Sequence, residues 1–204
     1  MARSPRKNLN NPFIALSHKN FRVYWLGMCV SFIGSWMQNT AQPWLAYSLT
    51  DSPLLLSLVS MLQFMPMLLF SLFAGVVVDR LPKKRLLLIT QSASLVVTFV
   101  LAVLVSTGAV EYWHLLVSAA VLGIVNTLDM PVRQAFVVEL VGREHLMNAI
   151  ALNSTVVNIA RILGPAIAGI LMGAAGIAAC FYINSLSFLA VIVSLFFIKP
   201  NEAH

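Results

Sequence analysis

The chain has 204 residues, of which 59% are apolar and only 10% are charged, and its mean hydropathy is +0.87. A soluble domain carries roughly 25% charged residues, so this composition excludes a soluble globule, a disordered tail and a nucleic-acid-binding protein. The net charge of +6 does not bring nucleic acid back as a partner, because the basic residues lie between long apolar runs that indicate contact with membrane lipid.

Runs without Asp, Glu, Lys or Arg predict where the chain crosses the membrane. They cover 23–50, 52–78, 86–110, 112–128, 145–160 and 162–198. A helix needs about 20 residues to cross a hydrocarbon core of about 30 Å. The last run is too long for one span, and Gly173-Ala-Ala-Gly176 is the natural break in it. We therefore expect an all-α membrane protein with six spans, near 23–48, 54–78, 86–107, 112–131, 147–173 and 177–198.

The basic residues predict the orientation of these spans. Twelve of the thirteen lie on one side of the predicted bundle, and the other side has only Asp51 and Glu111. The positive-inside rule then places both termini in the cytoplasm. We expect a multi-pass protein of a bacterial-type inner membrane, with residues 1–22 as a cytoplasmic segment and 199–204 as the start of a cytoplasmic linker.

The first span contains polar residues at helical spacing, which are costly in lipid. They are Ser35, Gln38, Asn39 and Gln42. One interpretation is that they line a substrate path together with the aromatic Trp36 or Trp44, because a few polar groups among apolar ones orient a ligand. The alternative is that Gln38 and Asn39 only form hydrogen bonds with a neighbouring helix.

The loop between spans two and three reads Gly75-Val-Val-Val-Asp79-Arg80-Leu-Pro82-Lys83-Lys84-Arg85. It resembles the signature loop of the major facilitator superfamily, G-x-x-x-D-R-x-G-R-R, with Pro82 where that family usually has Gly. The resemblance implies a conformational latch formed by Gly75, Asp79, Arg80, Lys84 and Arg85. A glycine here would let a neighbouring helix approach closely. The alternative is that the basic residues only set the topology of a tight turn.

The fourth span ends in Asp129-Met-Pro131-Val-Arg133. We expect Asp129 at its cytoplasmic end to contact Arg133 or Arg85, or to be a solvated loop charge. Asp129 is also a candidate for proton coupling, because spans one, two, three and six contain no Asp or Glu. If protons drive transport, Asp129 or carboxylates outside this chain must carry them.

The fifth span contains Asn158 and Arg161 on one helical face. A charge at mid-membrane costs about 2.5–3.5 kcal/mol on insertion scales, so we expect Arg161 to face the bundle interior and to take part in the substrate path. Pro165 removes the donor for the Arg161 carbonyl, so Gly164-Pro165 is a candidate hinge. The alternative is that Gly164, Ala166, Gly169 and Gly173 simply allow tight packing, and both roles can hold at once.

Three further stretches resemble the exporter branch of the same superfamily, which includes siderophore and macrolide efflux proteins. They are Phe21-Arg22-Val-Tyr-Trp25-Leu-Gly27, Asp129-Met-Pro131-Val-Arg133-Gln-Ala-Phe and Ala160-Arg161-Ile-Leu-Gly164-Pro165-Ala-Ile-Ala-Gly169. The last also resembles the Gly-Pro motif of the superfamily's antiporters. The resemblance implies the N-terminal half of a twelve-span fold, built from two inverted three-helix repeats. It implies proton-coupled efflux of a small amphipathic molecule by alternating access.

The alternatives to a transporter are an intramembrane enzyme and a six-helix channel or scaffold. An intramembrane enzyme would need a nucleophile, paired carboxylates or metal ligands at depth, and no such motif occurs in the sequence. We expect no cofactor and no metal. A six-helix channel or scaffold acting as a homo-oligomer is the main alternative, although rings of pore-lining charge are missing. The partners expected are lipid, a small-molecule substrate, protons if they drive transport, and either a missing C-terminal half or a second copy.

Overall fold

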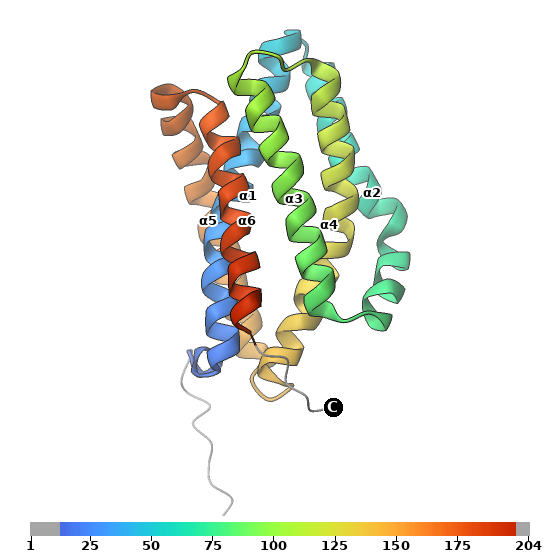
Figure 1. The fold of residues 1–204 in the computed structure, drawn as a ribbon, viewed down its shortest axis with the longest axis vertical. Helices are drawn as coiled ribbons and strands as arrows, with labels where there is room; N and C mark the ends of the chain where they lie inside the picture. The colour runs from blue at the N-terminus through green and yellow to red at the C-terminus, as the bar shows by residue number, and fades with distance from the viewer. Residues whose placement is uncertain (1–12, 199–204) are drawn as a thin grey trace, which may run out of the picture.

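The computed structural model describes residues 13–198, which form one bundle of long helices (Figure 1). A short 3-10 turn, Ile14–Ser17, precedes α1. Successive helices run in opposite directions and are joined by short connections, as expected when each crosses a membrane. Their bounds are α1 (Lys19–Thr50), α2 (Pro53–Arg80), α3 (Lys83–Ser106), α4 (Tyr112–Val141), α5 (Leu146–Ala175) and α6 (Ala178–Phe197).

Five of these helices, α2 to α6, are long and apolar enough to cross a membrane. The remaining one, α1, is the longest at 32 residues. It includes the polar residues Gln38, Asn39 and Gln42, which lower its hydropathy. Its length and its place within the bundle are those of a sixth spanning helix.

The helix contacts follow a two-fold pattern. The helix α1 packs on α6 and α5, α2 packs on α4, and α3 packs between α4 and α6. Exchanging α1, α2 and α3 with α4, α5 and α6 maps these contacts onto themselves: α1–α6 becomes α4–α3, and α2–α4 becomes α5–α1. Because each triplet contains an odd number of antiparallel helices, α4 starts at the end of the bundle opposite to the start of α1. This pattern is that of two inverted three-helix repeats.

Glycines allow close contacts between several of these helices. A Cβ added at Gly34 would lie 2.5 Å from the Ser187 hydroxyl of α6, and one at Gly123 would lie 2.6 Å from the Gln63 carbonyl of α2. Small residues at such positions let helix backbones approach, and van der Waals packing then replaces the hydrophobic effect that lipid cannot supply. The α1–α6 and α2–α4 pairs are therefore built on glycine.

One end of the bundle is basic. It carries the start of α1, the α2–α3 and α4–α5 loops and the end of α6, and we call it the basic end; its cations include Lys19, Arg80, Lys83, Lys84, Arg85 and Arg143. There Nε2 of His18 lies 3.0 Å from Nδ1 of His145, so α1 and α5 begin side by side. One buried apolar cluster fills this end of the bundle and a second fills the other end.

The fourth helix is longer than predicted. The expected span stopped at 131, whereas α4 continues through Pro131 to Val141. A proline removes one backbone hydrogen bond, but Val132, Phe136 and Val137 are buried beyond it and hold the helix in place. As a result Asp129 lies within α4 and not at the end of that helix.

The second helix is the least covered. Its buried residues are only Val59, Ala74 and Val78, although it is strongly apolar throughout. In Figure 1, α2 and α5 lie at opposite sides of the bundle, and α5 also exposes many apolar side chains. These surfaces are suited to lipid or to another protein, because water would not tolerate them.

Candidate functional site

A buried charge cluster joins α3 and α4 near the basic end. Asp129 accepts hydrogen bonds at Oδ1 from the Thr90 hydroxyl at 2.6 Å and from Gln91 Nε2 at 2.8 Å. Its other oxygen accepts a hydrogen bond from Nε of Arg133, one turn further along α4. The Asp129 carboxylate is therefore shared between two helices and is shielded from solvent. It is not a solvated loop charge.

The same cluster reaches α1. The Arg133 guanidinium carbon lies 5.4 Å from the centre of the Phe32 ring, and the Tyr24 ring packs edge-on against Phe136 of α4. Of the two contacts expected for Asp129, the structure has the one with Arg133. Arg85 is exposed instead. The helix α3 begins directly after Pro82, and Arg85 lies on the exposed face of its first turn.

A second buried polar cluster joins α1, α3 and α6. Oε1 of Gln38 accepts hydrogen bonds from Thr98 of α3 at 3.2 Å and from Asn184 Nδ2 of α6 at 2.5 Å. Gln38 also donates to Gln42 at 3.1 Å, and the Ser187 hydroxyl donates to Asn184. Gln38 and Gln42 thus hold helices together within the bundle.

The polar stripe predicted on α1 is divided by this packing. Gln38 and Gln42 are buried, Ser35 is half-buried, and Asn39 is exposed. Asn39 accepts a hydrogen bond at 3.3 Å from Gln63 of α2. The four side chains therefore do not share one environment, since a polar stripe on a helix meets different neighbours at its two edges.

The exposed side of α1 meets α5 through an aromatic–cation contact. The Arg161 guanidinium carbon lies 5.3 Å from the centre of the Trp36 ring. Arg161 is exposed on the six described helices, whereas we expected it to face the bundle interior. Asn158 is also exposed, and among residues 13–198 its amide donates to the Ser154 carbonyl of its own helix. Of the residues predicted for a substrate path, Trp36 and Arg161 are therefore brought together, while Asn39 lies one turn along α1.

Gly164 makes this contact possible. A Cβ added there would lie 2.4 Å from the Trp36 Cβ, so α1 and α5 meet closely where the Trp36 side chain leaves its helix. Gly169, which we expected to serve the same role, has open space around it in the described part of the chain. The helix α5 also runs unbroken through Pro165. Among the described residues, Gly164 therefore allows tight packing of α5 on α1, and Gly169 makes no such contact.

Replacing Gly164 with leucine is expected to lower stability by about 1–3 kcal/mol, the usual cost of overpacking a tight contact. The matched control is Gly169→Leu, which places the same side chain on the same helix in open space. The measurement is the thermal unfolding midpoint of the purified natural gene product in detergent. Equal midpoints for the two variants would show that the α1–α5 contact tolerates a separation of the helices.

The predicted latch residues lie at the basic end, and they differ in their contacts. Lys84 donates to the Ile198 carbonyl at 2.7 Å, which ties the start of α3 to the end of α6. Lys83 lies 3.6 Å from a carboxylate oxygen of Glu139. Asp79 and Arg80 are exposed and take part in no ion pair among residues 13–198.

Among residues 13–198 no helix approaches Gly75 closely, so its expected role stays a prediction. A Cβ added at Gly75 would meet nothing within 4 Å among these residues. Gly75, Asp79 and Arg80 therefore all present themselves outward from the six helices. Any contact that they form with protein must come from outside the described bundle.

Several polar partners were not singled out from the sequence. Thr90 and Gln91 bind Asp129, and Thr98 and Asn184 bind Gln38. Each lies in an otherwise apolar span, so the rule that flagged Gln38 would also have flagged them. Spacing alone cannot pair residues of different helices. Among residues 13–198 no group of three or more His, Cys, Asp or Glu is placed to hold a metal ion.

Comparison with known proteins agrees with this arrangement. Residues 10–204 match the family described as "Transmembrane secretion effector". The chain is 33% identical over 142 residues to a protein of Staphylococcus aureus named as a staphyloferrin A transporter, covering 69% of this chain and 36% of that protein. It is 31% identical over 175 residues to an uncharacterized MFS-type transporter of Bacillus subtilis, covering 85% of this chain and 40% of the relative.

A third relative, macrolide efflux protein A of Streptococcus pyogenes, is 26% identical over 151 residues, which cover 74% of this chain and 37% of that protein. The chain thus spans about two fifths of the length of the curated relatives that it matches. These relatives are transporters and not enzymes. The six-helix bundle with inverted repeats and the match over residues 10–204 show that the chain belongs to the major facilitator superfamily of transporters, in its transmembrane secretion effector family.

Proposed function

We propose that this chain is the N-terminal half of an exporter that moves a small amphipathic molecule out of the cell by alternating access. The observation that carries the proposal is the exposed contact of Trp36 of α1 with Arg161 of α5, together with the apolar surfaces that α2 and α5 leave uncovered. A second six-helix half would cover these surfaces, and the relatives have the additional length needed for one.

The two halves would rock about a substrate site between them. In this proposal Trp36, Asn39, Asn158 and Arg161 line the substrate path, with Gln38 and Gln42 supporting α1 from behind. Asp79 and Arg80 form the latch by contacting the second half in one of the two states, which explains why they point away from the described bundle. Gly164-Pro165 serves as the hinge of α5. The basic end faces the cytoplasm, as the distribution of Lys and Arg indicates.

Proton coupling would act through Asp129. Its charge holds Arg133 of the same helix and the polar side chains of Thr90 and Gln91 of α3. Protonation would remove the negative charge and weaken these contacts, so binding of a proton would favour a state in which α3 and α4 pack differently.

The test of export uses cells that lack their main efflux pumps and express the natural gene product. We expect such cells to accumulate less of a fluorescent amphipathic dye, and a protonophore should abolish the difference. In inside-out vesicles, Asp129→Asn should remove the dependence of dye uptake on an imposed pH gradient, while Glu139→Gln at the protein surface should keep it. Equal dependence in the two variants would exclude Asp129 as the coupling group.

The mass of the natural gene product in its membrane separates this proposal from the main alternative. A polypeptide of about twice 22.3 kDa that begins with this sequence supports the two-half exporter. A stable 22.3 kDa product would instead favour a homodimeric transporter, or a channel or scaffold assembled from several copies. The oligomeric state in detergent then distinguishes a dimer from a larger ring.

A further inference from the structure

Arg161 is a cation near the middle of α5, and no anion lies beside it in the part of the chain that the structure describes. The helix α5 runs from Leu146 to Ala175, so Arg161 lies near its middle, roughly 20 Å from either end at 1.5 Å per residue. Its guanidinium is exposed and contacts the Trp36 ring. Within residues 13–198 it takes part in no ion pair and no hydrogen bond.

The carboxylates of the described chain lie elsewhere. Asp51 and Glu111 cap helices at the end opposite the basic end. Asp79, Glu139 and Glu144 lie at the basic end, and Asp129 is buried with Arg133. The face that carries Arg161 is therefore positive at mid-depth. A charge there is costly unless something of opposite charge or water meets it.

The Trp36 contact prepares Arg161 to bind an anion. A guanidinium lying over an aromatic ring keeps its N–H groups, which lie in its own plane, free to donate. Two of these donors can bind the two oxygens of a carboxylate at once, which gives a stronger and more specific contact than a single hydrogen bond. Gly164, one turn along α5, lets the ring approach closely enough to hold the guanidinium in this position.

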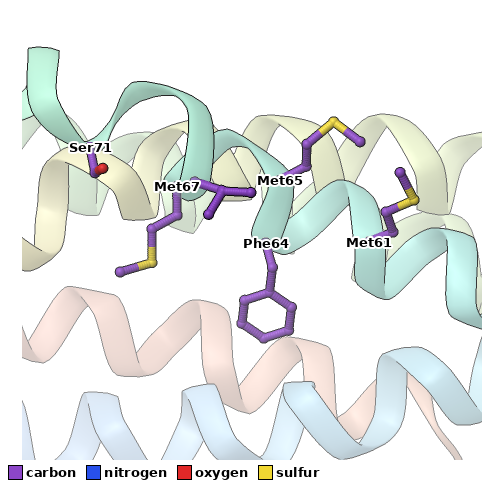
Figure 2. A pocket seen from close by; sticks show the side chains of 6 residues that line it. Met61, Phe64, Met65, Met67 and Ser71 are labelled. Carbon is purple, nitrogen blue, oxygen red and sulfur yellow. The ribbon is translucent and has the colours of Figure 1, made fainter.

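The bundle also offers an apolar surface on α2. Asn39, one turn beyond Trp36 on α1, is hydrogen-bonded to Gln63 of α2. Beside Gln63 begins an open hollow of about 620 Å³, lined by Met61, Phe64, Met65, Met67, Leu68 and Ser71. Figure 2 shows Phe64 and Met67 projecting to the same side of α2. Methionine side chains adapt to apolar groups of different shapes.

From these features we infer that the transported molecule is an amphipathic anion, whose carboxylate binds Arg161 and whose apolar part lies against the Met61–Ser71 hollow of α2. This inference rests on the proposed export function and names the class of its substrate. Neutral and cationic molecules with the same apolar part would lack the contact with Arg161.

The test compares three probes that differ only in charge: a dansyl-labelled twelve-carbon carboxylate, its primary amide and the corresponding amine. Binding to the purified natural gene product in detergent is followed by dansyl fluorescence, and transport is followed in inside-out vesicles. We expect the carboxylate to bind best. Arg161→Gln should weaken its binding by about 10- to 100-fold, the usual worth of a hydrogen bond to a charged group, and should leave amide binding unchanged. Arg161→Lys should retain part of the preference.

Arg143→Gln is the matched control, since it removes the same charge from an exposed position at the basic end. Equal weakening of all three probes by Arg161→Gln would overturn the inference and make Arg161 a structural residue or the partner of a carboxylate in the second half. Preference for the amine would also overturn it. Carboxylate binding without any transport would leave the site standing and refute the exporter, whereas dye export without carboxylate binding would refute only the site.

Discussion

Replacing Arg133 with leucine is expected to destabilise the folded protein by about 3–5 kcal/mol, the usual cost of removing one partner of a buried ion pair. Asp129 would keep its hydrogen bonds from Thr90 and Gln91 but would lose the positive charge that balances it. An uncompensated carboxylate between α3 and α4 then favours states in which the helices separate. The measurement is the thermal unfolding midpoint of the natural gene product in detergent.

The double variant Asp129→Leu/Arg133→Leu tests whether the lost charge balance is the cause. It removes both charges, so we expect it to recover much of the stability that Arg133→Leu loses, because well-packed apolar residues can replace a buried ion pair. Arg143→Leu, at an exposed position beyond the end of α4, should leave the midpoint within about 0.5 kcal/mol of the original. A double variant as unstable as Arg133→Leu would show that packing by Arg133, for example against Phe32, matters more than its charge.

The second large effect is expected for Asp79→Asn, which should lower the transport rate by about 10- to 100-fold, corresponding to a lost hydrogen bond to a charged group. Asp79 is exposed on the described bundle and has no ion pair there, so its substitution should not disturb the six helices. If the side chain contacts the second half in one state only, its loss shifts the balance between the two states.

The control for Asp79 is Asp51→Asn, which removes the same charge at the end of the bundle opposite the basic end. Both variants should insert into the membrane at normal abundance, and only Asp79→Asn should slow transport. Normal transport at normal abundance would mean that the basic residues around Asp79 set the topology and form no latch. Arg80→Gln, measured beside Asp79→Asn, would show whether the neighbouring cation shares the role.

The helices themselves could be predicted because each long apolar run must form its backbone hydrogen bonds internally in lipid. The charge-free runs indicated six spans, and the structure has six helices. The length of α4 beyond its expected span could not be predicted from Pro131, because buried apolar residues after the proline carry the helix onward. Local rules for proline describe one lost hydrogen bond and not the packing that outweighs it.

The candidate site could be predicted only in part. Arg161 and Asp129 stood out because charged residues are rare inside apolar spans. Their neighbours did not, since Trp36 meets Arg161 from another helix and Thr90 meets Asp129 from a third. Such contacts depend on which helices pack together and at what rotation, and one sequence does not specify this.

The amino-acid sequence by itself determined that the protein lies in a membrane, how many helices it forms and which side carries the positive charge, because hydropathy and charge act along the chain. The tertiary structure decided which polar residues are structural and which are exposed. It buried Gln38 between α3 and α6 and left Asn39, its neighbour in the chain, on the outer face. Adjacent residues on a helix point about 100° apart, so only the packing of the other helices could assign one to the interior and the other to the surface.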